Sequence, residues 1–382
     1  MNSWKAHFSR FLEASPGRLH VAAHSHHPWP DVSFDAHQQA WLDAAERMDD
    51  KWDKVFGEVI PEAQGHVARQ LHLSDPTTVV FAPSTHELLM RLLSCLRELR
   101  VLTSDAEFHS FTRQMRRLEE ERLARVKRVA AEPFGSFAGR FGEAVTAGGY
   151  DLLFFSHVHF NSGYLTPDLP ALVAAAPSEA MVVVDGYHGF LALPTDLSAI
   201  EEQAFYMAGG YKYAMAGEGA CFMHCPPGRC PRPRDTGWFA GFEGMTEAQG
   251  GAVPYPADAS RFLGATLDPS PLYRFNAVQR WLGQLGVTVD AIHAHVGRLQ
   301  KLLLDRLGDW ARASLVPAES EVSDRGNFLT FRLPDAGAVH LRLHDAGIVT
   351  DFRDDRLRVG FGIYHDETDV DTLAGHLVKA RG

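Results

Sequence analysis

The sequence is short of cysteine, of basic residues and of long apolar runs. Four cysteines among 382 residues are too few to staple the chain, which disfavours a disulfide-rich extracellular scaffold. No run of 18 apolar residues predicts a membrane span, and the first residues lack the apolar stretch of a secretory signal. We therefore expect a cytoplasmic protein that does not insert into a membrane.

Acidic residues outnumber basic ones. There are 37 Lys and Arg residues against 48 Asp and Glu residues, giving a formal net charge of −11. A negative protein is repelled by polyanions, so neither nucleic acid nor an anionic membrane is an expected partner. The 45% of apolar residues is ordinary for a globular protein with a large core.

Two groups of potential metal ligands stand in the sequence. Three cysteines and a histidine lie within residues 221–230, but their spacing fits no closed tetrahedral zinc framework, so we expect reduced thiols. The histidines within residues 24–27, beside Trp29, could bind a metal but are explained more simply as a polar wall of a ligand pocket. We expect no metal.

Short apolar runs alternate with amphipathic segments from about residue 76. This alternation predicts an α/β domain with a mostly parallel sheet covered by helices on both faces. In such sheets, ligands bind beyond the carboxyl ends of the strands. We expect strands at 78–81, 100–103, 151–156 and 181–185, and helices at 85–99, 112–124 and 168–176.

The flanking segments predict the domain organisation. Residues 1–60 begin irregularly and continue as a helix over 31–57, a segment expected to contribute to the active site and to a small domain. Residues 61–270 are the expected large domain, and residues 271–382 the expected small α+β domain. Its expected helices are 275–285, 288–306, 335–346 and one from Thr368, and its strands are 328–333, 348–352 and 356–361.

Polar residues follow the ends of three apolar runs. Ser84 and Thr85 precede a helix, where they are either a phosphate cradle or a plain N-cap. Asp185, with His188 three residues on, ends a very apolar strand, where a carboxylate needs a partner or is a turn cap. Lys212 lies between two tyrosines and two glycine clusters, and is either a buried Schiff-base lysine or a snorkelling surface lysine.

Several short motifs add to these residues. Each is modest alone, and their order along the chain is the informative property. They are Ser-His-Val at 156–158, Asp-x-x-His at 185–188, Tyr-Lys-Tyr at 211–213, Gly-x-Gly at 217–219, Gly-Trp-Phe at 237–239, Val349 with Asp351 and Arg353, and Leu-Arg-Val at 357–359.

In this order the sequence resembles the fold-type I pyridoxal-phosphate enzymes of aminotransferase class V, and kynureninases most closely. The resemblance implies a large domain with a seven-stranded, mostly parallel sheet and pyridoxal 5′-phosphate as the cofactor. It implies that Lys212 forms the Schiff base and moves protons, while Asp185 keeps the pyridine nitrogen protonated.

The resemblance also implies roles for the surrounding residues. Phe108 would stack on the ring, Asn161 would bind its phenolic oxygen, and His188 would support the ring. Ser84, Thr85 and Tyr211 would bind the phosphate, as would Thr266 of a neighbouring subunit, which implies a homodimer with shared active sites. Arg358 would clamp the α-carboxylate of an amino-acid substrate, with Arg353 as the alternative. The other substrate-side candidates are Trp238, His24 and Ser25.

The sequence departs from kynureninases on the substrate side. Phe111 stands where an aspartate is usual, a Ser-Asn-Pro loop is replaced at 266–269, and the N-terminal motif is only His-Ser-His-His. We expect hydrolytic Cβ–Cγ cleavage of a kynurenine-type substrate, with a class V aminotransferase or a β-elimination lyase as alternatives. No cysteine follows Cys230, which argues against the cysteine desulfurase branch.

Two further alternatives are less favoured. A cofactor-free relative with a binding or structural role is disfavoured because the lysine, aspartate and arginine are all retained. A nucleotide-dependent dehydrogenase is disfavoured because no Gly-x-Gly-x-x-Gly follows an early strand.

Overall fold

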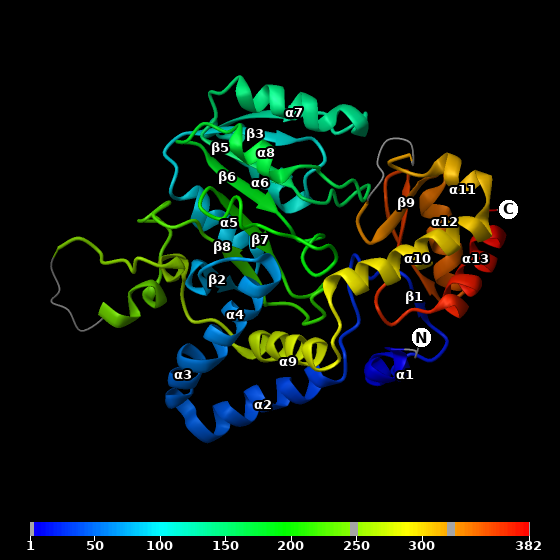
Figure 1. The fold of residues 1–382 in the computed structure, drawn as a ribbon, viewed down its shortest axis with the longest axis horizontal. Coiled ribbons are helices and arrows are strands. Elements are labelled where there is room, and N and C mark those ends of the chain that lie inside the picture. Colours follow the sequence, from blue (N-terminus) through cyan, green and yellow to red (C-terminus); the bar gives the residue numbers. More distant parts are fainter. Residues whose placement is uncertain (1–3, 245–250, 319–324, 382) are drawn as a thin grey trace.

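The structure, a computed structural model, describes residues 4–244, 251–318 and 325–381. Its larger part is built on a seven-stranded sheet with the order β2-β8-β7-β6-β5-β3-β4, in which only β8 runs antiparallel to its neighbours (Figure 1). The strands are β2 (Val79–Ala82), β3 (Leu99–Ser104), β4 (Ala124–Val129), β5 (Leu152–Ser156), β6 (Met181–Asp185), β7 (Ala204–Ala208) and β8 (Cys221–His224).

This sheet confirms the predicted mostly parallel α/β architecture. The four expected strands are present, and β4, β7 and β8 are additions that the apolar-run criterion did not find. β4 is an edge strand with alternating charged residues, and β7 is wholly buried but has no β-branched residue. The sheet therefore exceeds the expectation only in strands without a continuous β-branched pattern.

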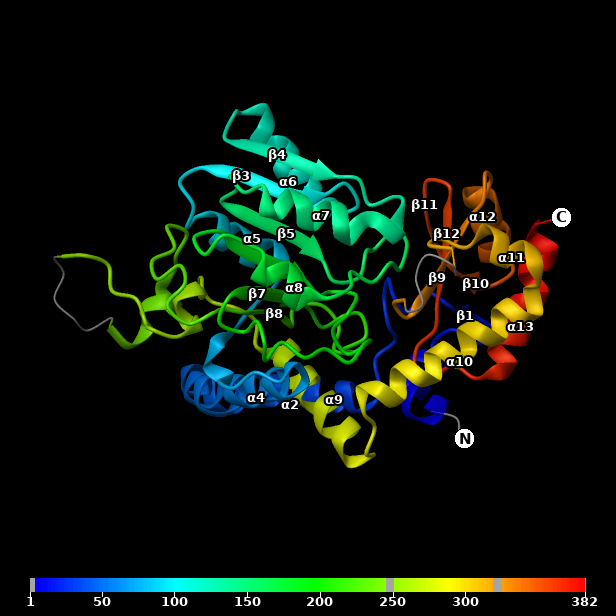
Figure 2. The same cartoon turned by 45° about the horizontal axis from the view of Figure 1, so that its top comes forward.

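Helices cover both faces of the sheet. One face packs against α4, α7 and α8, and the other against α5 and α6. Figure 2 shows α2 and α4 beside α9, below the sheet. The helices are α2 (Val32–Arg47), α3 (Lys51–Lys54), α4 (Ile60–Leu71), α5 (Thr85–Leu93), α6 (His109–Glu120), α7 (Phe137–Thr146), α8 (Leu169–Ala174) and α9 (Ser270–Gln284).

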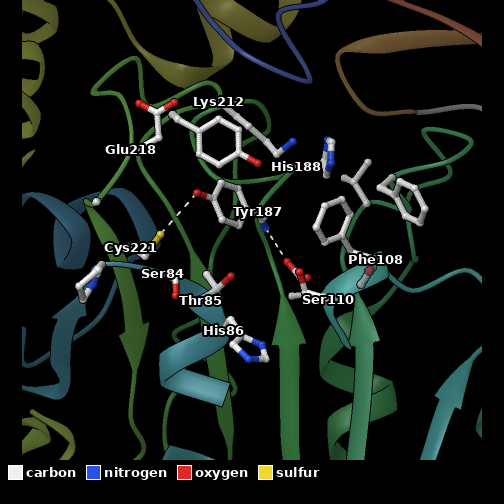
Figure 3. Close-up of a pocket in the computed structure, with 17 residues that line it drawn as sticks. Ser84, Thr85, His86, Phe108, Ser110, Tyr187, His188, Lys212, Glu218 and Cys221 are labelled. Carbon is white, nitrogen blue, oxygen red and sulfur yellow. Dashed lines mark hydrogen bonds between the residues drawn. The ribbon is translucent and has the colours of Figure 1, made fainter. Parts of the chain in front are cut away.

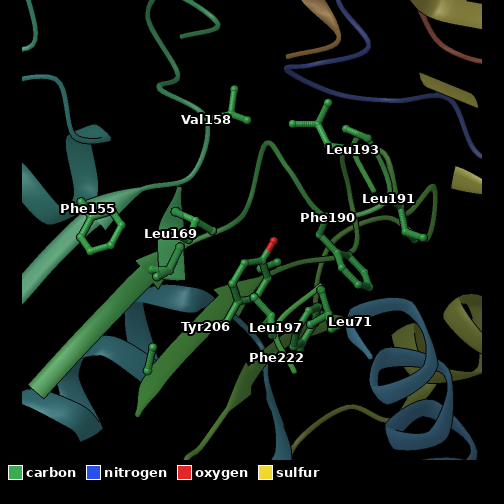
Figure 4. Close-up of a cluster of buried hydrophobic side chains, with 14 of the residues drawn as sticks. Leu71, Phe155, Val158, Leu169, Phe190, Leu191, Leu193, Leu197, Tyr206 and Phe222 are labelled. Atoms are coloured by element: carbon green, nitrogen blue, oxygen red, sulfur yellow. The ribbon is translucent and has the colours of Figure 1, made fainter. Parts of the chain in front are cut away.

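The main core lies on the α4, α7 and α8 face. Phe155 of β5, Tyr206 of β7 and Phe222 of β8 are almost completely buried there, and Leu71 and Phe190 pack against them (Figure 4). Fully burying such side chains contributes about 1.5–3 kcal/mol each. This packing fixes the strands whose carboxyl ends carry the polar residues.

The smaller part is an α+β layer around a three-stranded antiparallel sheet of order β11-β12-β9. The N-terminal segment joins it, because β1 (Leu19–His20) pairs in parallel with β10 (Ile348–Val349). Its other elements are β9 (Phe328–Arg332), β11 (Asp351–Arg353), β12 (Arg356–Gly360), α10 (Val289–Leu307), α11 (Asp309–Ser314), α12 (Ala336–Asp345) and α13 (Glu367–Arg381).

Local expectations differ from the structure in several places. The expected helix over 112–124 ends at Glu120, and Ala124 already belongs to β4. The expected strand over 348–352 is divided into β10 and β11, which pair in different sheets. The expected helix over 31–57 breaks at Met48, whose φ is 50°, and resumes as α3. The first thirty residues contain α1 (Ser9–Glu13) and β1 rather than being irregular throughout. The expected helix over 85–99 ends at Leu93, and Leu99 already belongs to β3.

The division at residue 270 remains a prediction. Helix α9 packs on α2 and α4, and Leu272 and Phe275 join the core of the larger part. None of the helices in the described ranges combines the length and apolar character needed to cross a bilayer.

Gly186 offers a test of the packing beneath the sheet edge. A Cβ added there would lie 1.9 Å from the Tyr206 ring, so Gly186→Ala must displace that ring or the backbone after β6. We expect a loss of about 1–3 kcal/mol in the free energy of unfolding, measured by urea denaturation. As the control, Gly139→Ala in α7 meets no atom within 4 Å and should gain about 0.5–1 kcal/mol. Equal effects of the two substitutions would contradict this packing.

Candidate active site

A cavity of about 260 Å³ lies at the carboxyl edge of the large sheet (Figure 3). Ser156 and Asp185 reach it from the ends of β5 and β6, and Lys212 reaches it from the loop after β7. Residues at the starts of α5 and α6 also line it. Seven of the predicted site residues line it: Ser84, Thr85, Phe108, Asp185, His188, Tyr211 and Lys212.

Lys212 is a buried amine. Its side chain is 5% exposed, and its Nζ donates a hydrogen bond to the His24 carbonyl oxygen at 2.9 Å. Burial, together with the nearby positive charge of Arg358, lowers the pKa of this amine to about 7. The snorkelling alternative is therefore wrong, and the amine is partly neutral near neutral pH.

Asp185 lies at the end of β6 with its carboxylate facing the same cavity. One of its oxygens, Oδ1, accepts a hydrogen bond from the Tyr187 backbone N–H at 2.9 Å. Burial raises the pKa of this carboxyl group, while the charge of Lys212 opposes the rise. A protonated ring nitrogen at this place would give the carboxylate the cationic partner that its burial favours.

Two of the residues expected around the ring, of which His188 lines the cavity and Asn161 does not, have buried polar atoms without a hydrogen-bond partner within the described part of the chain. These atoms are Nδ1 of His188 and Oδ1 of Asn161. Burial holds the pKa of His188 well below its usual range, so the ring is neutral. A neutral imidazole and an amide both suit an oxygen-bearing aromatic ring, which agrees with the roles implied for these residues.

The start of α5 forms the other end of the cavity. The Ser84 hydroxyl accepts a hydrogen bond from the Glu87 backbone N–H at 3.2 Å, so Ser84 is the N-cap of this nine-residue helix. The cap does not exclude an anion, because Ser84 and Thr85 both line the cavity and the Ser84 hydroxyl keeps its own hydrogen to donate.

Phe108 begins α6 and lines the cavity with its ring. Phe160 lies edge-on to it, with ring centroids 5.3 Å apart and an interplanar angle of 88°. Phe111, one turn on, stacks on Phe154 in the core at 3.8 Å. The position where kynureninases have an aspartate is thus part of the apolar core.

The two candidate arginines differ in burial. Arg358 on β12 is 3% exposed and donates hydrogen bonds to Asp351 and to the Phe160 carbonyl oxygen, while its buried Nε has no hydrogen-bond partner in the described ranges. Arg353 has a side chain 39% exposed and donates to the other oxygen of Asp351 at 2.6 Å. Burial lowers the pKa of Arg358 to about 10, which still leaves it charged.

The N-terminal segment contacts Lys212 through the His24 carbonyl oxygen, although His24 does not line the cavity. His24 is completely buried, its ring stacks on Phe328 at 4.6 Å, and neither ring nitrogen has a hydrogen-bond partner among the residues that the structure describes. Gly360 makes room for it, since a Cβ there would lie 2.3 Å from His24 Nδ1. Ser25, the next candidate, is half-buried and turns back to bond Ala22.

Thr266 and Trp238 lie outside this cavity. The Trp238 indole Nε1 donates to the Thr266 hydroxyl at 3.2 Å, and Thr266 lines a second cavity of about 500 Å³. Pro83 and His86 line both cavities, so the second one opens beside the α5 end of the first. In a single chain these two residues do not meet Lys212.

Three residues with notable surroundings were not predicted from the sequence. Tyr187 and Cys221 line the cavity, and Tyr187 stands inside the recognised Asp-x-x-His motif, where its bulk was a usable signal. Glu107 follows β3 and is 3% exposed. It accepts hydrogen bonds from the hydroxyls of Ser104 and Ser156, both at 2.5 Å, and burial raises its pKa to about 7.

Comparison with solved structures gives the same architecture. A lysine-to-alanine mutant of C-DES, with glycine covalently linked to its PLP cofactor, superposes with a TM-score of 0.83 at 17% identity, covering 98% of both chains. The apo cysteine desulfurase of Thermococcus onnurineus NA1 has a TM-score of 0.81 at 15% identity, covering 100% of this chain and 98% of that one. At these identities the likeness shows the fold alone.

Comparison of sequences gives a relative and a family. Isopenicillin N epimerase of Streptomyces clavuligerus is 30% identical over 257 residues, and the match spans 60% of this chain and 60% of that protein. The sequence pattern described as aminotransferase class-V matches residues 34–373, which include every predicted site residue except His24 and Ser25. The chain therefore belongs to the aminotransferase class-V family, the pyridoxal-phosphate enzymes that its motifs resemble.

Proposed function

We propose that this enzyme acts on an α-amino acid by moving the proton at the substrate's Cα, with Lys212 as the group that moves it. The observation that carries the proposal is the buried Lys212 amine, which shares one cavity with Asp185 and has a pKa of about 7. When bound, pyridoxal phosphate supplies an electron-accepting ring that makes the Cα proton acidic.

The cavity residues divide between the two ends of the cofactor. Asp185 holds the ring nitrogen protonated, and His188 with Asn161 binds the phenolic oxygen, which gives partners to their orphaned atoms. Phe108 covers a ring face. At the other end, Thr85 with Ser84, at the start of α5, and Tyr211 bind the phosphate.

Lys212 is suited to work in both directions of a proton transfer. With a pKa of about 7, neutral and charged amine are both populated at neutral pH. The neutral form accepts a proton from Cα, and the charged form returns one. The His24 carbonyl oxygen, 2.9 Å from Nζ, orients the amine between these events.

Arg358 is the proposed site for the substrate carboxylate. Its guanidinium is buried and donates to the carbonyl oxygen of Phe160, a residue that lines the cavity, and its charge acts on Lys212. Asp351 holds it in place across the β11–β12 pair, while the free Nε leaves a donor for a further anion. Trp238, His24 and Ser25 remain proposed substrate-side residues, with Arg353 as the alternative carboxylate site.

The outcome after proton removal is proposed to be amino transfer or loss of a β-substituent. The comparisons support this broader amino-acid chemistry better than the kynurenine-type hydrolysis that the motifs suggested. The burial of Phe111 against Phe154 agrees, because the substrate side lacks the kynureninase aspartate. Epimerisation at Cα is a second candidate, favoured by the relative that is an isopenicillin N epimerase.

A homodimer with shared active sites is part of the proposal. Thr266 lies on a cavity that adjoins the phosphate end of its own site, and a second copy could bring its Thr266 to that end. The oligomeric state in solution, measured by light scattering, tests this arrangement.

The common step is testable without knowing the natural substrate. In D2O, the holoenzyme should exchange the Cα proton of at least one α-amino acid for deuterium, as followed by proton NMR. Lys212→Ala should abolish this exchange and the borohydride-reducible cofactor linkage while circular dichroism stays unchanged. Lys301→Ala, on the surface of α10, is the control. Exchange at the wild-type rate by Lys212→Ala would refute the role of Lys212.

The products then separate the outcomes. A 2-oxo acid formed only with an acceptor oxo acid indicates amino transfer, and one formed with ammonia indicates β-elimination. Loss of optical activity alone indicates epimerisation, and anthranilate with alanine from kynurenine indicates hydrolysis.

The pKa of Lys212 predicts how apoenzyme loading depends on pH. The neutral amine is the nucleophile, so the rate of covalent attachment should rise with pH through about 7 and become flat above about 8. Stopped-flow absorbance after mixing apoenzyme with pyridoxal phosphate measures this rate. A rate that keeps rising toward pH 10.5, the ordinary lysine value, would contradict the burial of this amine.

The carboxylate site is tested by a pair of arginine variants. Arg358→Gln should raise KM for the amino acid by about 10- to 100-fold, with a smaller change in kcat, because a charged hydrogen-bond partner is lost. Arg353→Gln is the matched control, and we expect little change in KM. If only Arg353→Gln raises KM, the carboxylate site belongs to Arg353 instead.

A further inference from the structure

We propose that the Tyr187 hydroxyl binds the phosphate group of the cofactor, in the space that Gly209 leaves open beside the start of α5. The proposal concerns the phosphate end of the site and rests on the cofactor assignment. It is independent of which reaction follows proton removal.

Tyr187 spans the cavity from one end to the other. Its backbone N–H is tied to Asp185 Oδ1 at 2.9 Å, which fixes its main chain at the end of the cavity where the ring nitrogen binds. From there the side chain runs across the cavity below Lys212, as Figure 3 shows. Its ring centroid lies 5.6 Å from Lys212 Nζ and 5.2 Å from the Tyr211 ring.

The hydroxyl of Tyr187 reaches the opposite end of the cavity. It contacts Cys221 Sγ at 3.4 Å. The backbones of Thr85, the first residue of α5, and of Gly210 lie beside the same sulfur. A phenol anchored at Asp185 thus places its hydroxyl among backbone N–H groups that are suited to an anion.

Gly209 is what admits this hydroxyl. A Cβ at Gly209 would lie 2.2 Å from the Tyr187 hydroxyl oxygen and 2.7 Å from Cys221 Sγ, so any larger residue would displace the phenol. Gly209, on the loop after β7, has no side chain, and the long side chain of Tyr187, from the loop after β6, occupies the space beside it.

The chemistry of the cavity requires neutral donors at this end. Among the described lining residues, Lys212 is the one lysine or arginine, and Glu218 adds a carboxylate to the same wall. Ser84 already accepts the Glu87 N–H. Burial raises the pKa of Tyr187 well above 10, so its hydroxyl stays protonated and donates. Thiols are weak hydrogen-bond partners, so a phosphate oxygen is a better acceptor than Cys221.

The alternative is that Tyr187 only fills space and packs on the ring. That role would depend on the aromatic ring and not on the hydroxyl. It would also affect pyridoxal and pyridoxal phosphate equally, because the two differ only in the phosphate group. This difference defines the experiment.

The test compares the affinity of apoenzyme for pyridoxal phosphate and for pyridoxal by absorbance titration. Tyr187→Phe keeps the ring and removes the hydroxyl. We expect Tyr187→Phe to lower the affinity for pyridoxal phosphate by about 10- to 100-fold, the effect of one hydrogen bond to a charged group. The affinity for pyridoxal should not change. Inorganic phosphate should slow loading of the wild type and do so less in the variant.

Tyr206→Phe is the matched control, because it removes another buried tyrosine hydroxyl, one that faces Gly186 and does not line the cavity. It should change neither affinity. Gly209→Ala is a second variant, which keeps the Tyr187 hydroxyl but displaces it. The affinity for pyridoxal phosphate divided by that for pyridoxal should fall, as for Tyr187→Phe.

Two results would overturn the inference. One is wild-type affinity of Tyr187→Phe for pyridoxal phosphate, and the other is an equal loss of both vitamers, which would assign Tyr187 to ring packing. Failure of the wild type to bind either vitamer would overturn the cofactor assignment itself, a result distinct from these two.

Discussion

The site depends on keeping an amine and a carboxyl group out of water within one cavity. Lys212 and Asp185 are both desolvated, and no ion pair joins them in the part of the chain that the structure describes. Burial therefore pushes both groups toward their neutral forms, lowering one pKa and raising the other. A cofactor with a protonatable ring nitrogen gives Asp185 a cationic partner, and its electrophilic carbon reacts with the neutral Lys212 amine. The burial of both groups therefore favours binding of such a molecule.

A second buried acid lies near this pair. Glu107 is hydrogen-bonded to Ser104 at the end of β3 and to Ser156 at the end of β5, and β5 pairs with β6 so that Ser156 lies opposite Asp185. The nearby charge of Asp185 adds to the burial that raises the pKa of Glu107 to about 7. Glu107 is thus held by two hydroxyl donors, and the Asp185 carboxylate, at the end of the neighbouring strand, is held by the Tyr187 backbone N–H.

Sequence reasoning was strongest where a pattern has one physical cause. The β-branched run Met181–Asp185 predicted a buried strand, and the polar residues at strand ends were brought together because parallel strands end at one edge. Sequence reasoning was weakest where the role of a residue depends on a contact with another element. Nothing local shows that Gly209 faces Tyr187, that Asp351 holds Arg358, or that Glu107 is buried, since each contact joins separate elements. The charged alternation of β4 concealed an edge strand for the same reason.

The segment that contacts Lys212, residues 21–24, is attached to the smaller part of the molecule. The carbonyl that accepts the hydrogen bond from Lys212 is that of His24, and the residues just before it are bonded to β12: Ala23 N–H to the Gly360 carbonyl, and Gly360 N–H to the Val21 carbonyl. Arg358 lies on that same strand. Arg358 and the carbonyl that accepts from Lys212 are therefore both attached to β12. A displacement of β12 would move the guanidinium and the acceptor of Lys212 Nζ together.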